Sequence, residues 1–163
     1  MRKNLLVFFC VAGFLLIAPG LRAEFVNVSP AAFTSLDGTA GAANGIFGQY
    51  VIKSGSAGWL YAPVNLPDGV VIKNIRVHYY DNAAADLGVN FVRVNHFIPD
   101  YNTVFYVESS GASTSHQWKT DSTHDTVAAH RLVSNGACTY FIVAVMPAAS
   151  SDLRIYSVQI EYN

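Results

Sequence analysis

The chain has 163 residues, of which 52% are hydrophobic, 13% aromatic and only 13% charged, and its formal net charge is −1. This balance excludes the basic surface that nucleic acids or anionic membranes require, and the length suits one domain with a substantial core. A low charge with many aromatic residues favours a folded domain that exposes some apolar surface.

The first 23 residues have the pattern of a secretory signal peptide. Arg2 and Lys3 precede an apolar run over residues 5–18, and Ala23 is a small residue suited to cleavage. The apolar run is shorter than the roughly 20 residues that a membrane span needs. We therefore expect the leader to be removed and residues 24–163 to form one domain without a membrane span. This domain would be secreted, and would lie in the periplasm, on the cell surface or outside the cell.

Beyond the leader, β-branched and aromatic runs alternate with clusters of Gly, Asn, Asp, Ser and Pro, which is typical of an all-β domain. Strands are expected at residues 25–28, 49–53, 59–64, 71–80, 87–96, 103–108, 116–119, 139–146 and 154–162. Residues 31–47 and 109–126 read as loops or poorly formed edges, and a short helix near 125–133 is compatible with the pattern. The sequence predicts an antiparallel, jelly-roll-like β-sandwich of about nine or ten strands.

The segment around residues 67–80 combines a turn with an alternating strand. Pro67–Gly69 (Pro-Asp-Gly) predicts a tight turn, because proline presets its own φ and glycine tolerates a positive φ. In the strand that follows, Val77 and Tyr79 alternate with Arg76 and His78. One face of this strand is therefore expected to be buried and the other to be polar and solvent-facing.

The next strand shows a change of phase. Leu87, Val89 and Phe91 form one alternating apolar set, and Val92 and Val94 form another that is offset by one residue. A β-bulge would produce this offset and keep both sets inward.

Two strands near the C-terminus have clear patterns. Residues 139–146 are apolar at nearly every position and therefore on both faces, which predicts a central strand. In the final strand, alternation places Tyr156, Val158, Ile160 and Tyr162 inward, with Ser, Gln and Glu outward.

At residues 57–163 the sequence resembles a group of uncharacterised secreted bacterial proteins. The resemblance is carried by an opening with Ala62, Pro63, Val64, Leu66, Pro67 and Gly69, and by the later Tyr80, Asp81, Asn82, Asp86, Leu87 and Arg93. The closing Leu-Arg-Ile-Tyr-Ser-Val-Gln-Ile-Glu-Tyr is similar to that group's last strand. The resemblance implies a secreted β-sandwich and supplies no catalytic residue.

The acidic turn after the first alternating strand has two interpretations. Asp81, Asn82 and Asp86 offer oxygen atoms of the kind that calcium prefers. Their spacing lacks the dense alternating carboxylates of a dedicated calcium loop, and Asp or Asn also ends strands by bonding the local backbone. We expect the turn role, with these three residues as weak metal candidates only.

No catalytic constellation stands out. Ser122, His124 and Asp125 lie close together in one loop, but a triad needs partners held in a fixed geometry and there is no Gly-x-Ser-x-Gly elbow. The five histidines show no zinc-binding spacing, and Cys138, alone once the leader is removed, fits a small buried side chain. We therefore expect no enzyme activity and no cofactor.

The aromatic residues are the most informative signal for function. Trp118, Tyr101 and Tyr80 have polar neighbours in the sequence and are the expected exposed ones. The favoured hypothesis is a non-catalytic structural or interaction module that associates with itself or with another surface protein. The alternative is a carbohydrate-binding module in which these three rings stack on a glycan. A secreted hydrolase ranks last.

Overall fold

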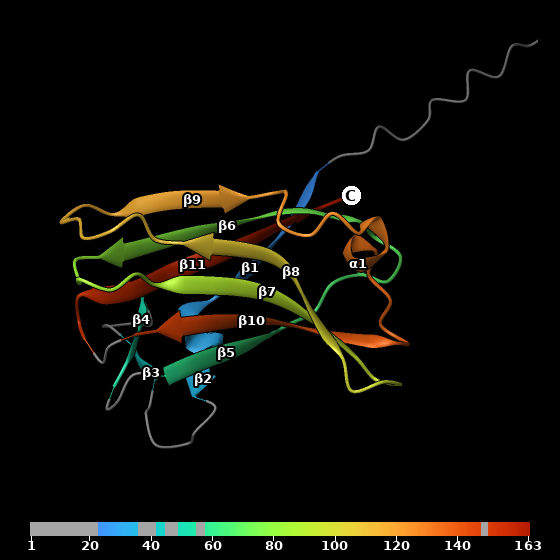
Figure 1. Cartoon of the computed structure of the whole chain (residues 1–163), viewed down its shortest axis with the longest axis horizontal. Helices are drawn as coiled ribbons and strands as arrows, with labels where there is room; N and C mark the ends of the chain where they lie inside the picture. The colour runs from blue at the N-terminus through green and yellow to red at the C-terminus, as the bar shows by residue number, and fades with distance from the viewer. Residues whose placement is uncertain (1–22, 36–41, 45–48, 55–57, 148–149) are drawn as a thin grey trace, which may run out of the picture.

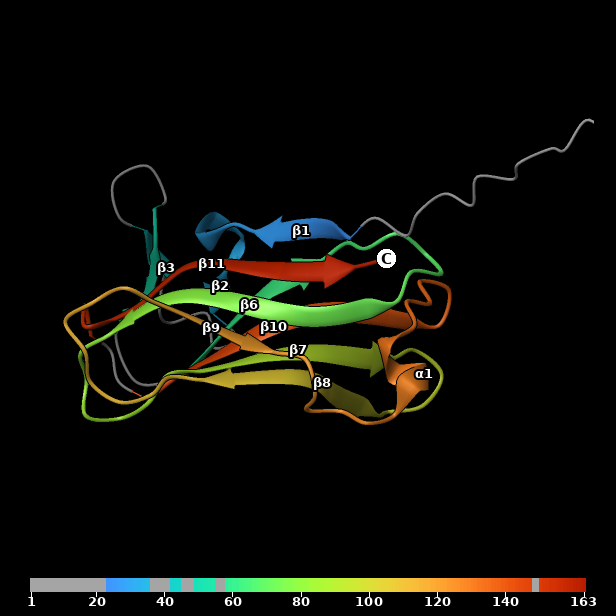
Figure 2. The same ribbon diagram turned by 90° about the horizontal axis from the view of Figure 1, so that it is seen from above.

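The computed structural model describes residues 23–35, 42–44, 49–54, 58–147 and 150–163, so the expected leader lies outside it except for Ala23. Within these ranges, two antiparallel sheets pack face to face, and Figure 2 shows them as two layers. This confirms the predicted all-β, jelly-roll-like sandwich. In the described part of the chain, no helix combines the length and apolarity needed to cross a bilayer.

The first sheet has six strands in the order β3-β4-β11-β6-β9, with β1 paired to β11. Their bounds are β1 (Glu24–Val28), β3 (Ala42–Asn44), β4 (Val51–Lys53), β6 (Ile72–Asp81), β9 (Gln117–Asp121) and β11 (Leu153–Tyr162). Strand β11 contacts β1, β4 and β6, so the last strand of the chain lies in the middle of this sheet.

The second sheet has five strands in the order β2-β5-β10-β7-β8. Their bounds are β2 (Thr34–Ser35), β5 (Gly58–Val64), β7 (Gly88–Asn95), β8 (Tyr101–Glu108) and β10 (Cys138–Met146). A 3-10 turn, η1 (Pro30–Ala32), and a single helical turn, α1 (Ala128–Arg131), complete the fold. Figure 1 shows α1 at the end of the sandwich where the chain terminates.

Each of the nine expected strands corresponds to a strand in the structure. Strands β2 and β3 lie inside residues 31–47, which the sequence pattern assigns to loops or poorly formed edges, and both are short strands at a sheet edge. Gly69 has a φ of 77°, as the predicted turn requires. Strand β10 is the middle strand of its sheet, as its apolar run predicts.

The core is formed by the inward side chains of both sheets. Val77 and Tyr79 from β6 and Phe91, Phe105 and Tyr140 from the other sheet are among the residues that are almost completely buried. The rings of Phe91 and Tyr140 are stacked with centroids 5.9 Å apart. Burial of each such side chain contributes about 1.5–3 kcal/mol, so the described part of the fold is held together by core packing. Cys138 is buried among them, as predicted.

Two orientations differ from the sequence prediction. The register of β7 with β8 does shift between Phe91 and Val92, but the extra residue is Val104 in β8, and β7 keeps its alternation against β10. Val92 therefore faces outward, together with its β10 partner Phe141. The outer face of this sheet is itself apolar, which is why an apolar residue stands there. Tyr156 also faces outward, since the pairing of β11 with β6 shifts between Ile155 and Ser157.

Candidate functional site

The outer face of the six-stranded sheet carries the largest collection of polar and aromatic side chains. The alternation of β6 turns Arg76 and His78 outward while Val77 and Tyr79 enter the core, as the sequence predicts. The pairing of β6 with β9 places Trp118 directly opposite His78. The same face receives Gln159 from β11, which is paired with Arg76.

Trp118 is held in place on this face by two β6 side chains. Its indole stacks on the His78 ring with 4.3 Å between centroids and 5° between the planes. The Arg76 Cζ lies 4.4 Å from the indole centroid, a cation–π contact. Because 48% of Trp118 remains exposed, these contacts fix the ring and still leave much of it open to solvent.

A shallow depression of about 360 Å³ lies beside the Trp118 ring. Phe25 from β1 and Trp118 supply its aromatic walls, and its polar lining consists of Asn74, Arg76, Thr120, Gln159 and Glu161. The Asn74 Nδ2 donates to the Glu161 Oε2 at 2.6 Å, and the Gln159 Nε2 donates to the Asn27 Oδ1 at 3.2 Å. These side-chain contacts orient the amide and carboxylate groups before any ligand arrives.

A second aromatic group continues along the same face. Tyr156 and His116 stack with centroids 4.5 Å apart, and the Tyr156 ring lies 4.9 Å from that of His78. The Arg154 Cζ lies 5.0 Å from the ring centroids of both Tyr50 and Tyr80. The Tyr80 ring lies 5.9 Å from that of His116, which in turn lies 5.6 Å from that of His78, so ring contacts connect Tyr80 with Trp118.

His78 is kept neutral by its surroundings. Burial lowers its pKa from 6.5, and the positive charges of His116 and Arg76 lower it further. At neutral pH the imidazole under Trp118 is therefore uncharged, which suits a flat stacking contact.

The three aromatic residues singled out from the sequence do not share one surface. Trp118 and the partly exposed Tyr80 lie on the outer face of the six-stranded sheet. Tyr101, 69% exposed, begins β8 in the other sheet, where it lines a different groove. The platform of all three is therefore wrong, because the pairing of β8 and β9 with different sheets cannot be read from their local sequences.

The polar residues of the depression were not predicted as site residues. The sequence predicts that Arg76 faces outward, but nothing local indicates that Phe25 and Gln159 lie beside it. The signal that would have identified them is the pairing of the first and last strands, Phe25 with Glu161 and Asn27 with Gln159.

The acidic turn makes the local contacts expected of it. The Asp81 carboxylate is fully buried and accepts the N–H groups of Ala83 at 2.9 Å and Leu87 at 3.4 Å. It also accepts the Ser109 hydroxyl, and the Asp86 Oδ1 accepts the Gly111 N–H at 2.9 Å. Asp81 and Asp86 thereby tie this turn to the loop after β8, whereas Asn82 is exposed on its rim. Among the described residues there is no group of three or more His, Cys, Asp or Glu suited to a metal ion.

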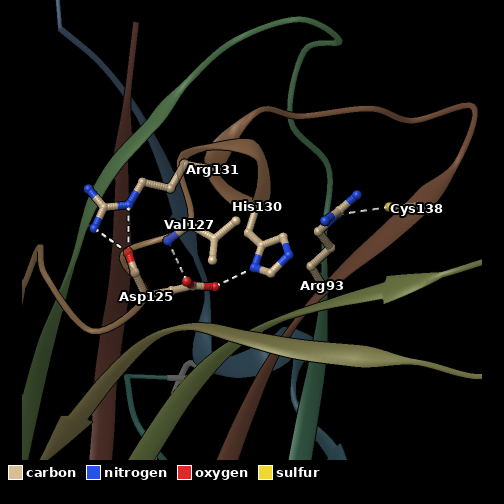
Figure 3. A network of polar contacts seen from close by, with 6 residues as sticks. All are labelled: Arg93, Asp125, Val127, His130, Arg131 and Cys138. Atoms are coloured by element: carbon tan, nitrogen blue, oxygen red, sulfur yellow. Dashed lines mark hydrogen bonds and ion pairs between the residues drawn. The ribbon is translucent and has the colours of Figure 1, made fainter.

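The loop with Ser122, His124 and Asp125 is organised around a different histidine (Figure 3). The Asp125 Oδ2 lies 2.6 Å from the His130 Nδ1, its Oδ1 accepts the Val127 N–H at 2.8 Å, and its main-chain oxygen accepts the Arg131 guanidinium. His124 instead packs near Tyr106. Asp125 thus joins the loop to α1, and its carboxylate bonds to His130 rather than to His124.

A charge-assisted contact next to this loop involves the lone cysteine. The Arg93 Nε donates to the Cys138 Sγ at 3.0 Å, as Figure 3 shows. Cys138 is buried where β10 begins, so the contact fixes the end of β7 against β10.

No family model matches the chain, and no curated protein matches its sequence. Among solved structures, the chain is similar to the CBM36-1 domain of a multidomain xylanase from the hindgut metagenome of Trinervitermes trinervoides, with a TM-score of 0.50 and 16% identity over 84% of this chain and 96% of that one. A structure described as CBM35 from Cellvibrio japonicus Abf62 aligns with a TM-score of 0.48 and 15% identity over 85% of this chain and 92% of that one. At such identity the first likeness shows a shared β-sandwich fold alone.

Proposed function

We propose that this chain is a secreted, non-catalytic carbohydrate-binding module that holds a glycan on the outer face of its six-stranded sheet. Trp118 stacks on one sugar ring, and the hydroxyl groups of that sugar bond to Asn74, Gln159 and Glu161 in the adjoining depression. The leader-like first 23 residues support export of the protein to a location where it can contact extracellular glycans.

The observation that carries this proposal is that Trp118 is fixed in orientation and yet exposed. Its indole is held by contacts with His78 and Arg76, yet about half of the residue is exposed beside oriented polar groups. A sugar presents apolar C–H groups on its ring faces and hydroxyls around its rim, so it needs an aromatic plane next to donors and acceptors. A ring that is already immobilised loses little entropy when the sugar binds.

The size of the depression agrees with a small ligand site. Its volume of about 360 Å³ falls within the range of known ligand pockets, at the lower end. The fold shared with a domain called CBM36-1, from a family of carbohydrate-binding modules, adds a precedent for sugar binding on this kind of sandwich. It does not select the sugar.

The proposal is tested by affinity electrophoresis and calorimetry on soluble xylan, galactomannan, β-glucan and pectin. We expect at least one to bind, and Trp118→Ala to weaken that binding by at least about tenfold, as the loss of an aromatic anchor does. Phe97→Ala is the matched control, since Phe97 is a 78% exposed aromatic in the turn after β7, away from the depression.

Two outcomes would count against this function. One is that none of the four polysaccharides binds the folded protein. The other is that Trp118→Ala and Phe97→Ala bind equally well, which would show that the glycan does not bind in the depression beside Trp118.

A further inference from the structure

The outer face of the five-stranded sheet is apolar, in contrast to that of the six-stranded sheet. In β10, Tyr140, Ile142 and Ala144 enter the core, while Val143 and Val145 face outward and remain partly exposed. Solvent-facing strand positions of an antiparallel sheet are usually polar. An apolar set there indicates a surface that is covered in the working protein.

The neighbouring strands extend this apolar face. Val145 of β10 is paired with Trp59 of β5, which is 57% exposed. On the other side, Val94 of β7 is paired with Tyr101 of β8, which is 69% exposed. Trp59 and Tyr101 therefore project from strands that are three strand spacings apart, roughly 14 Å.

A groove of about 350 Å³ lies between these two projecting aromatics. Val92, Val143 and Val145 form its apolar lining, and Asn90 and Thr103 are its uncharged polar members. The face thus has two protruding rings and a hollow between them, a shape that a rotated copy of itself can fill.

Charge is nearly absent from this face. Among the outward positions of the described strands of this sheet, Glu108 at the end of β8 is the one charged side chain, and it accepts the Tyr106 hydroxyl at 3.0 Å. When a surface meets its own copy across a two-fold axis, a charge close to the axis meets the same charge of the partner. A face with almost no charge avoids that repulsion, whereas a charged partner protein would find no complementary group on it.

The available area is enough for a dimer. Four of the five strands have seven to nine residues, and at about 4.8 Å between strands and about 3.3 Å per residue they give a face of roughly 500 Å². Two such faces bury roughly 1,000 Å², about the value that a specific interface needs.

We propose that the outer face of the five-stranded sheet binds the same face of a second copy of this chain about a two-fold axis, with Trp59 and Tyr101 of each copy packing against the groove of the other. The glycan-binding face of each copy then points away from the interface. This inference does not depend on the proposed sugar site.

The test is the mass of the purified protein in solution, measured by analytical ultracentrifugation up to about 0.5 mM, a range that detects even weak dimers. We expect a concentration-dependent dimer. Tyr101→Glu and Trp59→Ala should each weaken dimerisation by at least about tenfold, the first by placing like charges near the axis and the second by removing an anchor. Both side chains are largely exposed, so neither change disturbs the core.

Trp118→Ala is the matched control, because it removes an exposed Trp from the other sheet and should leave the dimer unchanged. A protein that stays monomeric over the whole concentration range overturns the proposal. A dimer that survives both Tyr101→Glu and Trp59→Ala overturns it as well. If the protein is monomeric and Trp59→Ala abolishes polysaccharide binding, this face binds glycan and not a second copy.

Discussion

The imidazole of His78 and the indole of Trp118 lie almost parallel, with 4.3 Å between their centroids, on neighbouring strands of the six-stranded sheet. Burial first, and then the positive charges of His116 and Arg76, lower the pKa of His78 below 6.5. In the window between the folded pKa and 6.5, the unfolded chain binds more protons at this site than the folded chain. The contribution of His78 to stability is therefore full above that window and falls as the pH drops through it.

Removal of the positive charge at position 116 should raise the pKa of His78. We expect His116→Gln to move it upward toward 6.5, with burial still holding it below that value. An NMR titration of the imidazole resonances measures this directly. His124→Gln, a change near Tyr106 and outside the causes that act on His78, should leave the pKa where it is. An unchanged His78 titration in His116→Gln would contradict the described geometry.

Asp81→Ala should strongly destabilise the fold. The substitution leaves the Ala83 N–H and the Ser109 hydroxyl without their acceptor in a buried site, at a cost of about 2–3 kcal/mol. Asp86→Ala, at an exposed position of the same turn, should cost less. Urea denaturation compares the two, and equal losses would refute the special role of Asp81.

Calcium should not change the stability of this turn. Because the Asp81 oxygens already accept hydrogen bonds from the protein, we expect the same melting temperature in calcium and in EDTA. Differential scanning calorimetry makes the comparison. A rise of several degrees in calcium that Asp81→Ala or Asp86→Ala abolishes would show that the turn is a metal site after all.

Tyr79→Phe removes a hydroxyl that joins β6 to the edge strand β9. The Tyr79 hydroxyl donates to the Gln117 Oε1 at 2.8 Å, and the ring is fully buried. We expect a loss of about 1 kcal/mol in the free energy of unfolding. Tyr106→Phe breaks a comparable bond to Glu108 at the surface, and should have a smaller effect in the same chemical denaturation series.

Asp125→Asn should make the stability of the fold less sensitive to a fall in pH. Desolvation alone would raise the pKa of Asp125, but the N–H of Val127, the bond to His130 and the charges of His130 and Arg131 together hold it below 3.8. The carboxylate therefore stabilises the fold fully above that pH, and this contribution is lost as the pH falls through the lower, folded-state pKa. Thermal melts between pH 7 and pH 2 should show a flatter dependence for the variant than for the parent chain. Parallel curves would mean that the Asp125 charge is not coupled to folding.

Local patterns were sufficient to predict all the described strands except the short β2 and β3, but not the composition of each face. The alternation of Val77 and Tyr79 with Arg76 and His78 correctly gave the orientation of β6, because side chains in a strand have a period of two. The same rule failed at Val92 and Tyr156. Val92 is apolar on an outer face, and Tyr156 lies at a register shift that depends on the partner strand.

The candidate site was only partly predictable for a related reason. Trp118 and Tyr101 were both expected to be exposed, and both are. Their separation onto two sheets depends on long-range pairing, as does the approach of Phe25 to Glu161. Such pairings reflect the packing of the whole core, so no short stretch of sequence encodes them.

The position of β11 affects when the fold can form. Glu24 in the first described strand pairs with Tyr162 near the end of the chain, and β6 pairs with the other edge of β11. The six-stranded sheet therefore cannot close during synthesis until β11 has left the ribosome, and contacts so distant in sequence form slowly. For a secreted protein, as we propose, this dependence on the last strand leaves the six-stranded sheet open while the chain is being made, a state that suits passage through a membrane before folding.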